Sequence, residues 1–378
     1  MGKLKVLHCY KTYYPVTFGG IEQVIFQLSE AMSSEGVEST VFCVNNRVHA
    51  DVKSFHNHYV YRSKKNFEIA STPFSIKAFR QFKELVKHYD VVHYHFPYPF
   101  MDMLHFASNV NKPSVVSYHS DIIKQKKLMG IYHPLMKSFL NNVDRIITAS
   151  PNYLKSSEVL QEFKGKVDVI PYGIPDITKF DTDPEVDQDI IKNFPRGYFL
   201  FVGSFRYYKG LHFLLEAMNG SDIPIVLLGA NGEEDNLKDY VEENRMNNIH
   251  FVGAKEDSVK YSYLAKAVGF VFPSHLRSEA FGISLVEAAC FSLPLISCEI
   301  GTGTTYINIS DHTGLVIEGA NPEQLKKAIS DIWKNTSKNE FYGNNARDRY
   351  EKLFTSKKMA SEYLKVYKEV ISKYDKSK

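Results

Sequence analysis

The stretch Ser278-Glu279-Ala280-Phe281-Gly282-Ile283-Ser284-Leu285-Val286-Glu287-Ala288-Ala289 carries two carboxylates eight residues apart. It follows the apolar run 268–273, which predicts a buried strand that ends at a proline. Residues 283–291 have an apolar face and predict a helix. The stretch therefore lies where a strand passes into a helix, and open α/β sheets bind their ligands at that end of the strands.

Gly282 lets the backbone approach a ligand closely, and the N–H groups at the start of the following helix favour an anion. Glu279 lies in the loop, whereas Glu287 lies about one turn inside the helix. We interpret the two glutamates as groups that hold two sugar rings of one elongated ligand. Two ordinary surface glutamates are the alternative, but Ala280 and Phe281 make the surroundings of Glu279 too apolar for a typical exposed loop.

Two series of alternating strands and helices make up most of the chain, and they predict parallel sheets covered on both faces by helices. In the first series, strands are predicted at residues 5–10, 39–44, 90–95, 114–118, 144–148 and 167–170. In the second series they are predicted at residues 198–203, 224–228, 249–252, 268–272, 294–298 and 314–317. The fold class is therefore α/β with two doubly wound domains.

The length of 378 residues favours two domains. The segment 176–195 is acidic, contains prolines and shows almost no apolar periodicity, so we interpret it as linker. We expect an N-terminal domain at 1–172, a linker at 173–196 and a C-terminal domain at 197–360. A final helix is predicted at 356–374.

The composition is typical of a soluble enzyme, with 44% hydrophobic and 24% charged residues. A net charge of +3 gives no reason to expect nucleic acid as a partner. No run of 18 apolar residues predicts a membrane span, and the N-terminus shows no signal peptide. The four cysteines fall at apolar positions without metal-ligand spacing, as expected of reduced thiols in the cytoplasm.

Two cations open the second series, in Gly203-Ser204-Phe205-Arg206-Tyr207-Tyr208-Lys209-Gly210-Leu211. Arg206 and Lys209 follow a strand and precede a helix, where the helix dipole disfavours positive charge. They suit a pyrophosphate, with arginine bidentate and lysine as a point charge. Two solvated surface cations are the alternative.

Two further candidates lie in the first series. Gly19 and Gly20 stand between a strand and a helix, where they would either offer N–H groups to a phosphate or form a plain tight turn. His119 follows a strand and is a candidate hydrogen-bond donor or base, although loop histidines are more often structural. The spacing decides neither case.

We predict no metal site. His93 and His95 alternate along a strand, but no third ligand follows them nearby. Asp181-Thr182-Asp183 has the form of the D-x-D motif of metal-dependent sugar transferases, but it lies in the acidic segment and not after a strand. We interpret it as solvated linker.

The segment Lys124–Lys137 joins a basic cluster to an apolar stretch. Such a segment suits the surface of an anionic membrane, where each basic residue contributes about 1 kcal/mol. An ordinary basic helix packed in the first domain is the alternative.

Taken together and in this order, these motifs resemble the retaining family 4 glycosyltransferases of the GT-B fold along the whole chain. Glu279-Ala280-Phe281-Gly282 with Glu287 matches the family signature of two glutamates separated by seven residues. The opening residues 8–24 look most like those of bacterial mannosyltransferases that build lipopolysaccharide O-antigen. The resemblance implies two Rossmann-like domains facing across a cleft, with residues 361–378 returning to the first domain.

The resemblance also implies roles for the charged residues. Arg206 and Lys209 would bind the donor diphosphate and stabilise the charge of the departing nucleotide, so that no metal and no cofactor are needed. Glu287 would accept hydrogen bonds from the ribose hydroxyls. Glu279 and its neighbours Ala280, Phe281, Gly282 and Ile283 would hold the transferred sugar.

In the first domain, the resemblance implies that His119 contacts the sugar near the reacting centre. Gly19 and Gly20 would leave room for donor and acceptor. His119 is followed by Ser120-Asp121, whereas many relatives have aspartate directly after this histidine. Tyr207-Tyr208 between the cations is also bulkier than usual.

The expected activity is retaining transfer of a hexose, first of all mannose from GDP-mannose, to a lipid-linked saccharide at the inner face of a bacterial membrane. A transferase that uses a UDP-linked N-acetylglucosamine, galactose or glucose is one alternative. A noncatalytic sugar-nucleotide-binding protein is another, against which the joint presence of Arg206, Lys209, Glu279 and Glu287 argues.

Overall fold

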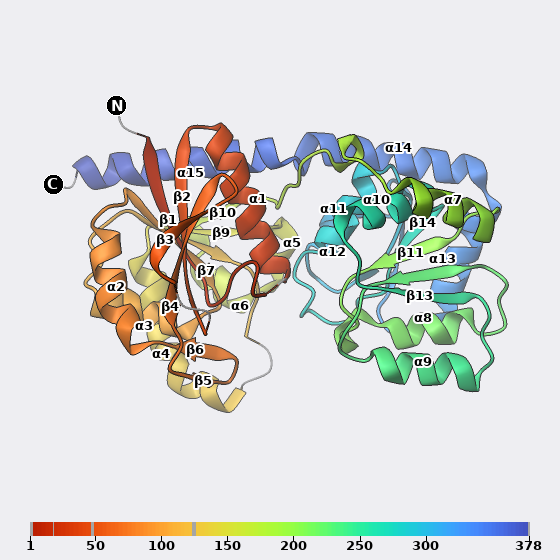
Figure 1. Cartoon of the computed structure of the whole chain (residues 1–378), viewed down its shortest axis with the longest axis horizontal. Coiled ribbons are helices and arrows are strands. Elements are labelled where there is room, and N and C mark those ends of the chain that lie inside the picture. Colours follow the sequence, from red (N-terminus) through yellow and green to blue (C-terminus); the bar gives the residue numbers. More distant parts are fainter. Residues whose placement is uncertain (1–2, 18, 47–48, 123–125, 377–378) are drawn as a thin grey trace. The chain divides into compact units, whose positions relative to one another are not determined.

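The computed structural model describes residues 3–17, 19–46, 49–122 and 126–376, and the chain divides into two compact units (Figure 1). The first unit comprises Met1–Gly173 together with Ser356–Lys378, and the second comprises Ile174–Thr355. Each unit is built on its own sheet.

The sheet of the first unit has the strand order β10-β9-β8-β7-β1-β2-β4-β3. All neighbouring strands are parallel except β3 and β4. The six strands predicted from apolar runs are confirmed as β1 (Leu4–Cys9), β2 (Val37–Asn45), β7 (Val91–Phe96), β8 (Ser114–Tyr118), β9 (Arg145–Thr148) and β10 (Val167–Val169). Four more strands were not predicted, namely β3 (His49–Phe55), β4 (His58–Lys64), and the hairpin of β5 (Phe67–Ile69) and β6 (Thr72–Phe74).

Helices of the first unit alternate with these strands, as a parallel sheet requires. They are α1 (Gly20–Ser34), α2 (Ile76–Val86), α3 (Pro99–Ala107), α4 (Lys126–Asn142), α5 (Pro151–Ser156), α6 (Glu158–Glu162) and the 3₁₀ turn η1 (Lys164–Lys166). The predicted final helix is α15 (Ser356–Lys376), which belongs to this unit. It packs on α1, and its buried Tyr363 and Tyr367 bond to side chains of the sheet.

The sheet of the second unit is wholly parallel, in the order β13-β12-β11-β14-β15-β16. Its predicted strands are confirmed as β11 (Phe199–Val202), β12 (Ile225–Leu228), β13 (Ile249–Gly253), β14 (Gly269–Phe272), β15 (Leu295–Glu299) and β16 (Gly314–Glu318). Numbered within the unit, the order is 3-2-1-4-5-6, the doubly wound arrangement of dinucleotide-binding domains. The strand order reverses between β11 and β14, so the loops that follow these two strands flank a crevice.

Helices of the second unit cover its sheet. They are α8 (Leu211–Met218), α9 (Glu234–Glu243), α10 (Asp257–Lys266), α11 (Ile283–Cys290), α12 (Thr304–Ile307), α13 (Pro322–Lys334) and α14 (Thr336–Leu353), with the 3₁₀ turn η3 (Tyr207–Lys209) after β11. The helix predicted at 283–291 is thereby confirmed as α11.

The interpretation of 176–195 as linker is wrong. This segment contains the 3₁₀ turn η2 (Ile177–Lys179) and the helix α7 (Pro184–Asn193), which packs on α10. The Asp183 side chain caps α7 by accepting from the N–H groups of Glu185 and Val186. Asp181-Thr182-Asp183 is therefore the start of a helix and not solvated linker.

Candidate functional site

The loops after β11 and β14 meet at the point where the strand order of the second unit reverses. The N–H of His275, after β14, donates to the carbonyl of Tyr208, after β11, over 3.0 Å. The first loop carries Arg206 and Lys209, and the second leads to Glu279. Sequence reasoning assigned these residues to one ligand, and the sheet topology now brings the two loops together.

Lys209 and Glu279 form an ion pair across this junction. Their side chains are 12% and 11% exposed, so water screens the pair only weakly. The Lys209 Nζ also lies 4.6 Å from the ring centroid of Phe272 and 5.4 Å from that of Tyr208. Ser274 donates to the Glu279 carboxylate over 3.3 Å. The Lys209 ammonium thus lies beside aromatic faces and pairs with one carboxylate. An anionic ligand would be attracted to it strongly, because the surroundings screen its charge only weakly.

Two glycines let the loops take these paths. Gly210 has φ +69° and caps η3, and a Cβ there would lie 2.2 Å from the carbonyl oxygen of Pro273. Gly282 has φ +97° and is the N-cap of α11, whose first N–H groups have no intrahelical acceptor. Both positions favour glycine because φ is positive. Gly210 has the further reason that the backbone just after β14 lies too close for a Cβ.

Glu287 lies inside α11 and pairs with Lys260 of α10, with 2.9 Å between the charged atoms. The two side chains are 6% and 12% exposed. Lys260 also pairs with Asp257 at 2.9 Å. Burial opposes the charge of Lys260, but Glu287 and Asp257 more than compensate and hold its pKa above the ordinary value. Sequence reasoning missed Lys260, because only the fold brings α10 beside α11.

The other predicted residues of the second unit lie around the same junction. Arg206 is exposed and is the N-cap of η3. Phe281 is buried and packs edge-on against Phe354, with ring centroids 6.1 Å apart. Ala280 and Ile283 are partly exposed on either side of Phe281 and Gly282, and the Ala280 carbonyl accepts from the N–H of Gly303 over 2.9 Å.

In the first unit, Gly19 is the N-cap of α1 and Gly20 is its first residue. The buried Glu22 closes the loop before them, because its carboxylate accepts from Thr12 at 2.9 Å and from Thr17 at 2.8 Å. A Cβ at Gly19 would lie 2.4 Å from this carboxylate, whereas one at Gly20 would meet nothing within 4 Å. Glu22 is a second group that sequence reasoning passed over, although its position in the first turn of a predicted helix was visible.

His119 follows β8 and is 5% exposed. Its Nε2 lies 3.0 Å from Nδ1 of His95, and its Nδ1 lies 2.5 Å from the hydroxyl of Tyr172. Burial lowers the pKa of His119 from 6.5 to about 3, so the ring is neutral at physiological pH. The structure therefore holds His119 as a neutral hydrogen-bonding group.

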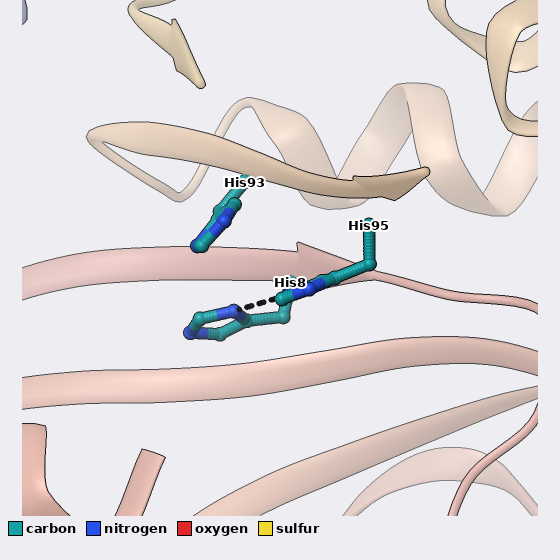
Figure 2. Close-up of side chains that lie close together, drawn as sticks. All are labelled: His8, His93 and His95. Atoms are coloured by element: carbon teal, nitrogen blue, oxygen red, sulfur yellow. Dashed lines mark hydrogen bonds between the residues drawn. The ribbon is translucent and has the colours of Figure 1, made fainter. Parts of the chain in front are cut away.

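His93 and His95 belong to the same buried network. His93 bonds to the hydroxyl of Tyr367 at 2.7 Å and to that of Ser117 at 2.8 Å. The Nε2 of His95 lies 3.1 Å from Nδ1 of His8, which the parallel pairing of β1 with β7 brings alongside (Figure 2). His8 was not among the predicted site residues.

The predicted membrane segment is described only in part, since its residues 124 and 125 lie outside the described residues. Its remainder forms the start of α4, where Ile131 is 82% exposed and Lys137 pairs with Glu162 at 2.6 Å. Among the residues that the structure describes, no helix combines the length and apolarity that a bilayer span requires.

Two family models match the chain, one for each half. The model described as Glycosyltransferase Family 4 matches residues 18–176, and that described as Glycosyl transferases group 1 matches residues 183–349. A curated relative, the D-rhamnosyltransferase WbpZ of Pseudomonas aeruginosa, is 47% identical over 93% of this chain and 93% of its own length. The chain belongs to the family 4 glycosyltransferases.

A second relative of this glycosyltransferase is the O-antigen chain mannosyltransferase C of Escherichia coli. It is 44% identical over 96% of this chain and 98% of its own length. The two names differ in the sugar transferred, so the match alone leaves the sugar open.

Solved structures show that the glycosyltransferase has the GT-B fold. Sucrose-phosphate synthase from Thermosynechococcus elongatus has a TM-score of 0.80 at 21% identity, covering 98% of this chain and 100% of its own. HepE of Anabaena, solved in complex with UDP, has a TM-score of 0.75 at 17% identity, covering 97% of this chain and 100% of its own.

Proposed function

We propose that this glycosyltransferase moves mannose from GDP-mannose to a lipid-linked saccharide in the synthesis of O-antigen, with retention of the anomeric configuration and without a metal. One observation carries the proposal, namely the Lys209–Glu279 pair at the reversal point of the sheet. The printed activities of the two relatives supply the sugar class. A bacterial surface polysaccharide implies an acceptor on the cytoplasmic side of a membrane.

The donor diphosphate would bind between Arg206 and Lys209. In the structure, Glu279 neutralises Lys209, and the incoming phosphates would take over that role. Glu279 would then be free to accept hydrogen bonds from the hydroxyls of the transferred sugar. As the bond between sugar and phosphate breaks, charge grows on the leaving diphosphate, and the two cations stabilise it without a metal ion.

Glu287 would accept hydrogen bonds from the ribose hydroxyls of the nucleotide. Lys260 would act as its positioning residue, because the ion pair fixes the carboxylate in a buried place. Ala280, Phe281, Gly282 and Ile283 supply the backbone that closes on the sugar.

His119 would donate to a hydroxyl of the transferred sugar. Because its ring is neutral, it orients the sugar without adding charge near the developing oxocarbenium ion. The contact exchanges one of its present hydrogen bonds for one to the sugar. We assign no covalent nucleophile, and retention would follow attack of the acceptor on the face from which the nucleotide leaves.

D-Rhamnose is the second candidate for the transferred sugar, favoured by the 47% identity to a D-rhamnosyltransferase. D-Rhamnose is mannose without its 6-hydroxyl. A site that hydrogen-bonds this hydroxyl rejects the deoxy sugar by several powers of ten, whereas an apolar pocket discriminates only weakly.

A donor panel tests the proposal. The purified protein would be incubated in EDTA with a polyprenyl-diphosphate-linked saccharide and each of GDP-mannose, GDP-D-rhamnose, UDP-N-acetylglucosamine, UDP-galactose and UDP-glucose. We expect α-linked transfer from GDP-mannose and little or none from the UDP sugars. Transfer from GDP-D-rhamnose alone would show that the transferred sugar is D-rhamnose and not mannose. Transfer from a UDP sugar alone would show that the donor nucleotide is UDP and not GDP. Binding of GDP-mannose without transfer to any acceptor would favour a noncatalytic protein, and loss of all transfer in EDTA would overturn metal independence.

We also propose that the first unit rests on an anionic membrane surface. Exposed apolar side chains project from β5, α3 and α4, which contact one another through β6, namely Phe67, Ile69, Met103, Phe106 and Ile131. These elements lie at one end of the first unit (Figure 1). Lys124, Lys126 and Lys127 precede Ile131 in the sequence and would add electrostatic attraction to acidic lipids.

Vesicles of phosphatidylglycerol and phosphatidylcholine test this surface. Ile131→Asp should weaken co-sedimentation with the vesicles, because it places a charge where an apolar side chain would enter the interface. Ile191→Asp is a matched control, since Ile191 is an exposed isoleucine on α7 of the other unit. Equal binding of both variants and the unmodified protein would show that α4 does not touch the membrane.

A further inference from the structure

Three histidines of the first unit share one face of its sheet. His8 lies on β1 and pairs in register with His93 on the neighbouring parallel strand β7. His95 lies two residues further along β7 and therefore projects from the same face. All three side chains are fully buried, and Figure 2 shows their rings close together between the strands.

The distances between these rings match those of a metal site. One nitrogen from each ring can be chosen so that all three lie within 4.8 Å of one another. The closest pair, Nδ1 of His8 and Nε2 of His95, is 3.1 Å apart. Two nitrogens that share a tetrahedral zinc ion, each about 2.0–2.1 Å from it, are about 3.3–3.4 Å apart. A metal ion can thus replace the proton between these two rings with a small movement, and that proton moves to another ring nitrogen of the cluster or is released to solvent.

A second shell for such a site already exists. His95 bonds through Nδ1 to His119 at 3.0 Å, which leaves its Nε2 toward the cluster. His93 bonds to hydroxyls at both nitrogens, and either hydroxyl can serve as acceptor while the other nitrogen turns to a metal. Ligating histidines in proteins commonly hold their second nitrogen in this way.

One buried nitrogen of the cluster has no hydrogen-bond partner among the described residues. It is Nε2 of His8. A histidine network that existed only to satisfy itself would not be expected to leave this atom unpaired, because an unpaired buried polar atom costs about 1–3 kcal/mol. His8 can therefore carry its proton on Nε2 and offer Nδ1 to an ion without giving up a hydrogen bond at Nε2.

We propose that His8, His93 and His95 bind one divalent transition-metal ion, zinc in the first place. Imidazole nitrogens suit zinc, nickel and copper and do not suit magnesium or calcium. The ion would join two adjacent strands of the first unit and stabilise that unit. The phosphate-binding residues of the proposed transfer reaction belong to the second unit. The link from the ion to that reaction would be the hydrogen bond between His95 and His119.

The sequence prediction of no metal site is thereby revised. It rested on the lack of a third ligand near His93 and His95, and the third ligand comes from β1 instead. Among the histidine, cysteine, aspartate and glutamate side chains that the structure describes, these three histidines form the group whose ligand atoms lie close enough to share one ion.

Metal retention by the full chain, made without a histidine tag, tests the site. The protein would be stripped with a chelator, mixed with excess Zn²⁺ or Co²⁺ and desalted. We expect one retained equivalent, a raised thermal midpoint, and an X-ray absorption spectrum of the bound ion with imidazole nitrogens. Retention of no metal by the unmodified protein, or a shell without imidazole, would overturn the proposal.

Variants locate the ion. His8→Gln and His95→Gln should lose the retained equivalent. His105→Gln should keep it, because His105 is a buried histidine of α3 that bonds to Tyr94 and Asn142 outside the cluster. Equal retention by all three variants would place the ion elsewhere and contradict the assignment.

A milder variant covers the case in which the ligand variants do not fold. Tyr367→Phe removes a hydroxyl that bonds to His93 but leaves all three ligands in place. Loss of such a second-shell partner should weaken zinc binding about 10–100-fold. Unchanged zinc affinity both in this variant and in Ser117→Ala, which removes the other hydroxyl on His93, would contradict the proposed coordination by His93.

Discussion

The two sheets of this glycosyltransferase follow the same doubly wound plan but differ at the ends of their central strands. In the second unit, opposite charges face one another there, as Lys209 with Glu279, and a second pair, Lys260 with Glu287, joins the helices α10 and α11. In the first unit, the corresponding place holds neutral imidazoles and hydroxyls, linked through His95.

Under the proposed function, this difference would separate the parts of a nucleotide sugar. A diphosphate carries negative charge and gains most where a weakly screened cation can exchange one anionic partner for another. A neutral network instead discriminates hydroxyl groups, or ligates a metal, and has no charge to offer a phosphate. The same sheet topology therefore supports two chemistries, chosen by the residues that follow its strands.

The largest expected effect concerns the charged junction. Lys209→Ala should lower kcat/KM for GDP-mannose by about 10²–10³-fold, the cost of losing one donor to a developing charge. Lys238→Ala is the control, because Lys238 is an exposed lysine that also pairs with a glutamate. Steady-state kinetics of both variants would measure the effect, and near-normal rates for Lys209→Ala would remove it from the phosphate site.

Loss of activity in Lys209→Ala must be separated from damage to the fold, since the change leaves Glu279 without its ion-pair partner. The double variant Lys209→Met/Glu279→Gln removes both charges together and should recover most of the stability. It should remain inactive. Recovery of activity along with stability would mean that the pair is structural.

The second buried pair should matter chiefly for stability. Lys260→Met leaves the 6% exposed carboxylate of Glu287 uncompensated, and should cost about 2 kcal/mol of unfolding free energy, below the value for fully buried pairs. Urea unfolding would measure it. The double variant Lys260→Met/Glu287→Gln should recover part of the loss, and a single variant as stable as the unmodified protein would contradict the coupling.

The neutral network should make the first unit sensitive to acid. Because the pKa of His119 falls from 6.5 to about 3 on folding, the unfolded chain binds the extra proton between these values. The contribution of neutral His119 to the free energy of unfolding is full above pH 6.5. It declines as the pH falls toward 3, by about 1.4 kcal/mol per pH unit.

Urea unfolding between pH 6 and pH 4.5 would check this dependence. His119→Asn should reduce the slope of unfolding free energy against pH, whereas replacement of the exposed His312 by asparagine should not. An unchanged slope in His119→Asn would mean that this ring does not stay neutral in the folded chain.

The last prediction compares two glycines. Gly210→Ala places a Cβ 2.2 Å from a backbone carbonyl at φ +69° and should cost about 1–3 kcal/mol. Gly20→Ala meets nothing within 4 Å at the start of α1 and should be neutral. Thermal unfolding would rank the two, and equal midpoints would contradict the close approach of the β11 and β14 loops.

Much of this molecule was predictable from sequence because buried parallel strands are continuous apolar runs, as in Phe199–Val202. The unpredicted hairpin Phe67–Phe74 has exposed residues along β5 and lacks such a run. Helix α7 was missed although Asp183 followed by Pro184 is a helix-start signal, because the acidic composition was given more weight.

The meeting of Lys209 with Glu279 was predictable because both residues follow strands, and the roles of Arg206, Lys209 and Glu279 in binding a donor stay a prediction. The site was not predictable where a partner arrives through packing. Lys260 reaches Glu287 only because α10 lies beside α11, and His8 reaches His95 across 87 residues through strand pairing. Neither contact leaves a periodic signal in the sequence.

The central claim is that the second unit holds a nucleotide diphosphate between its two cations without a metal. Calorimetric titration of GDP into the protein in EDTA tests it most directly, with Arg206→Ala and Lys209→Met/Glu279→Gln measured beside the unmodified chain. The account predicts binding by the unmodified protein and a loss of affinity of at least about tenfold in each variant, the loss of a charge-assisted contact. Equal affinity in all three proteins would contradict it.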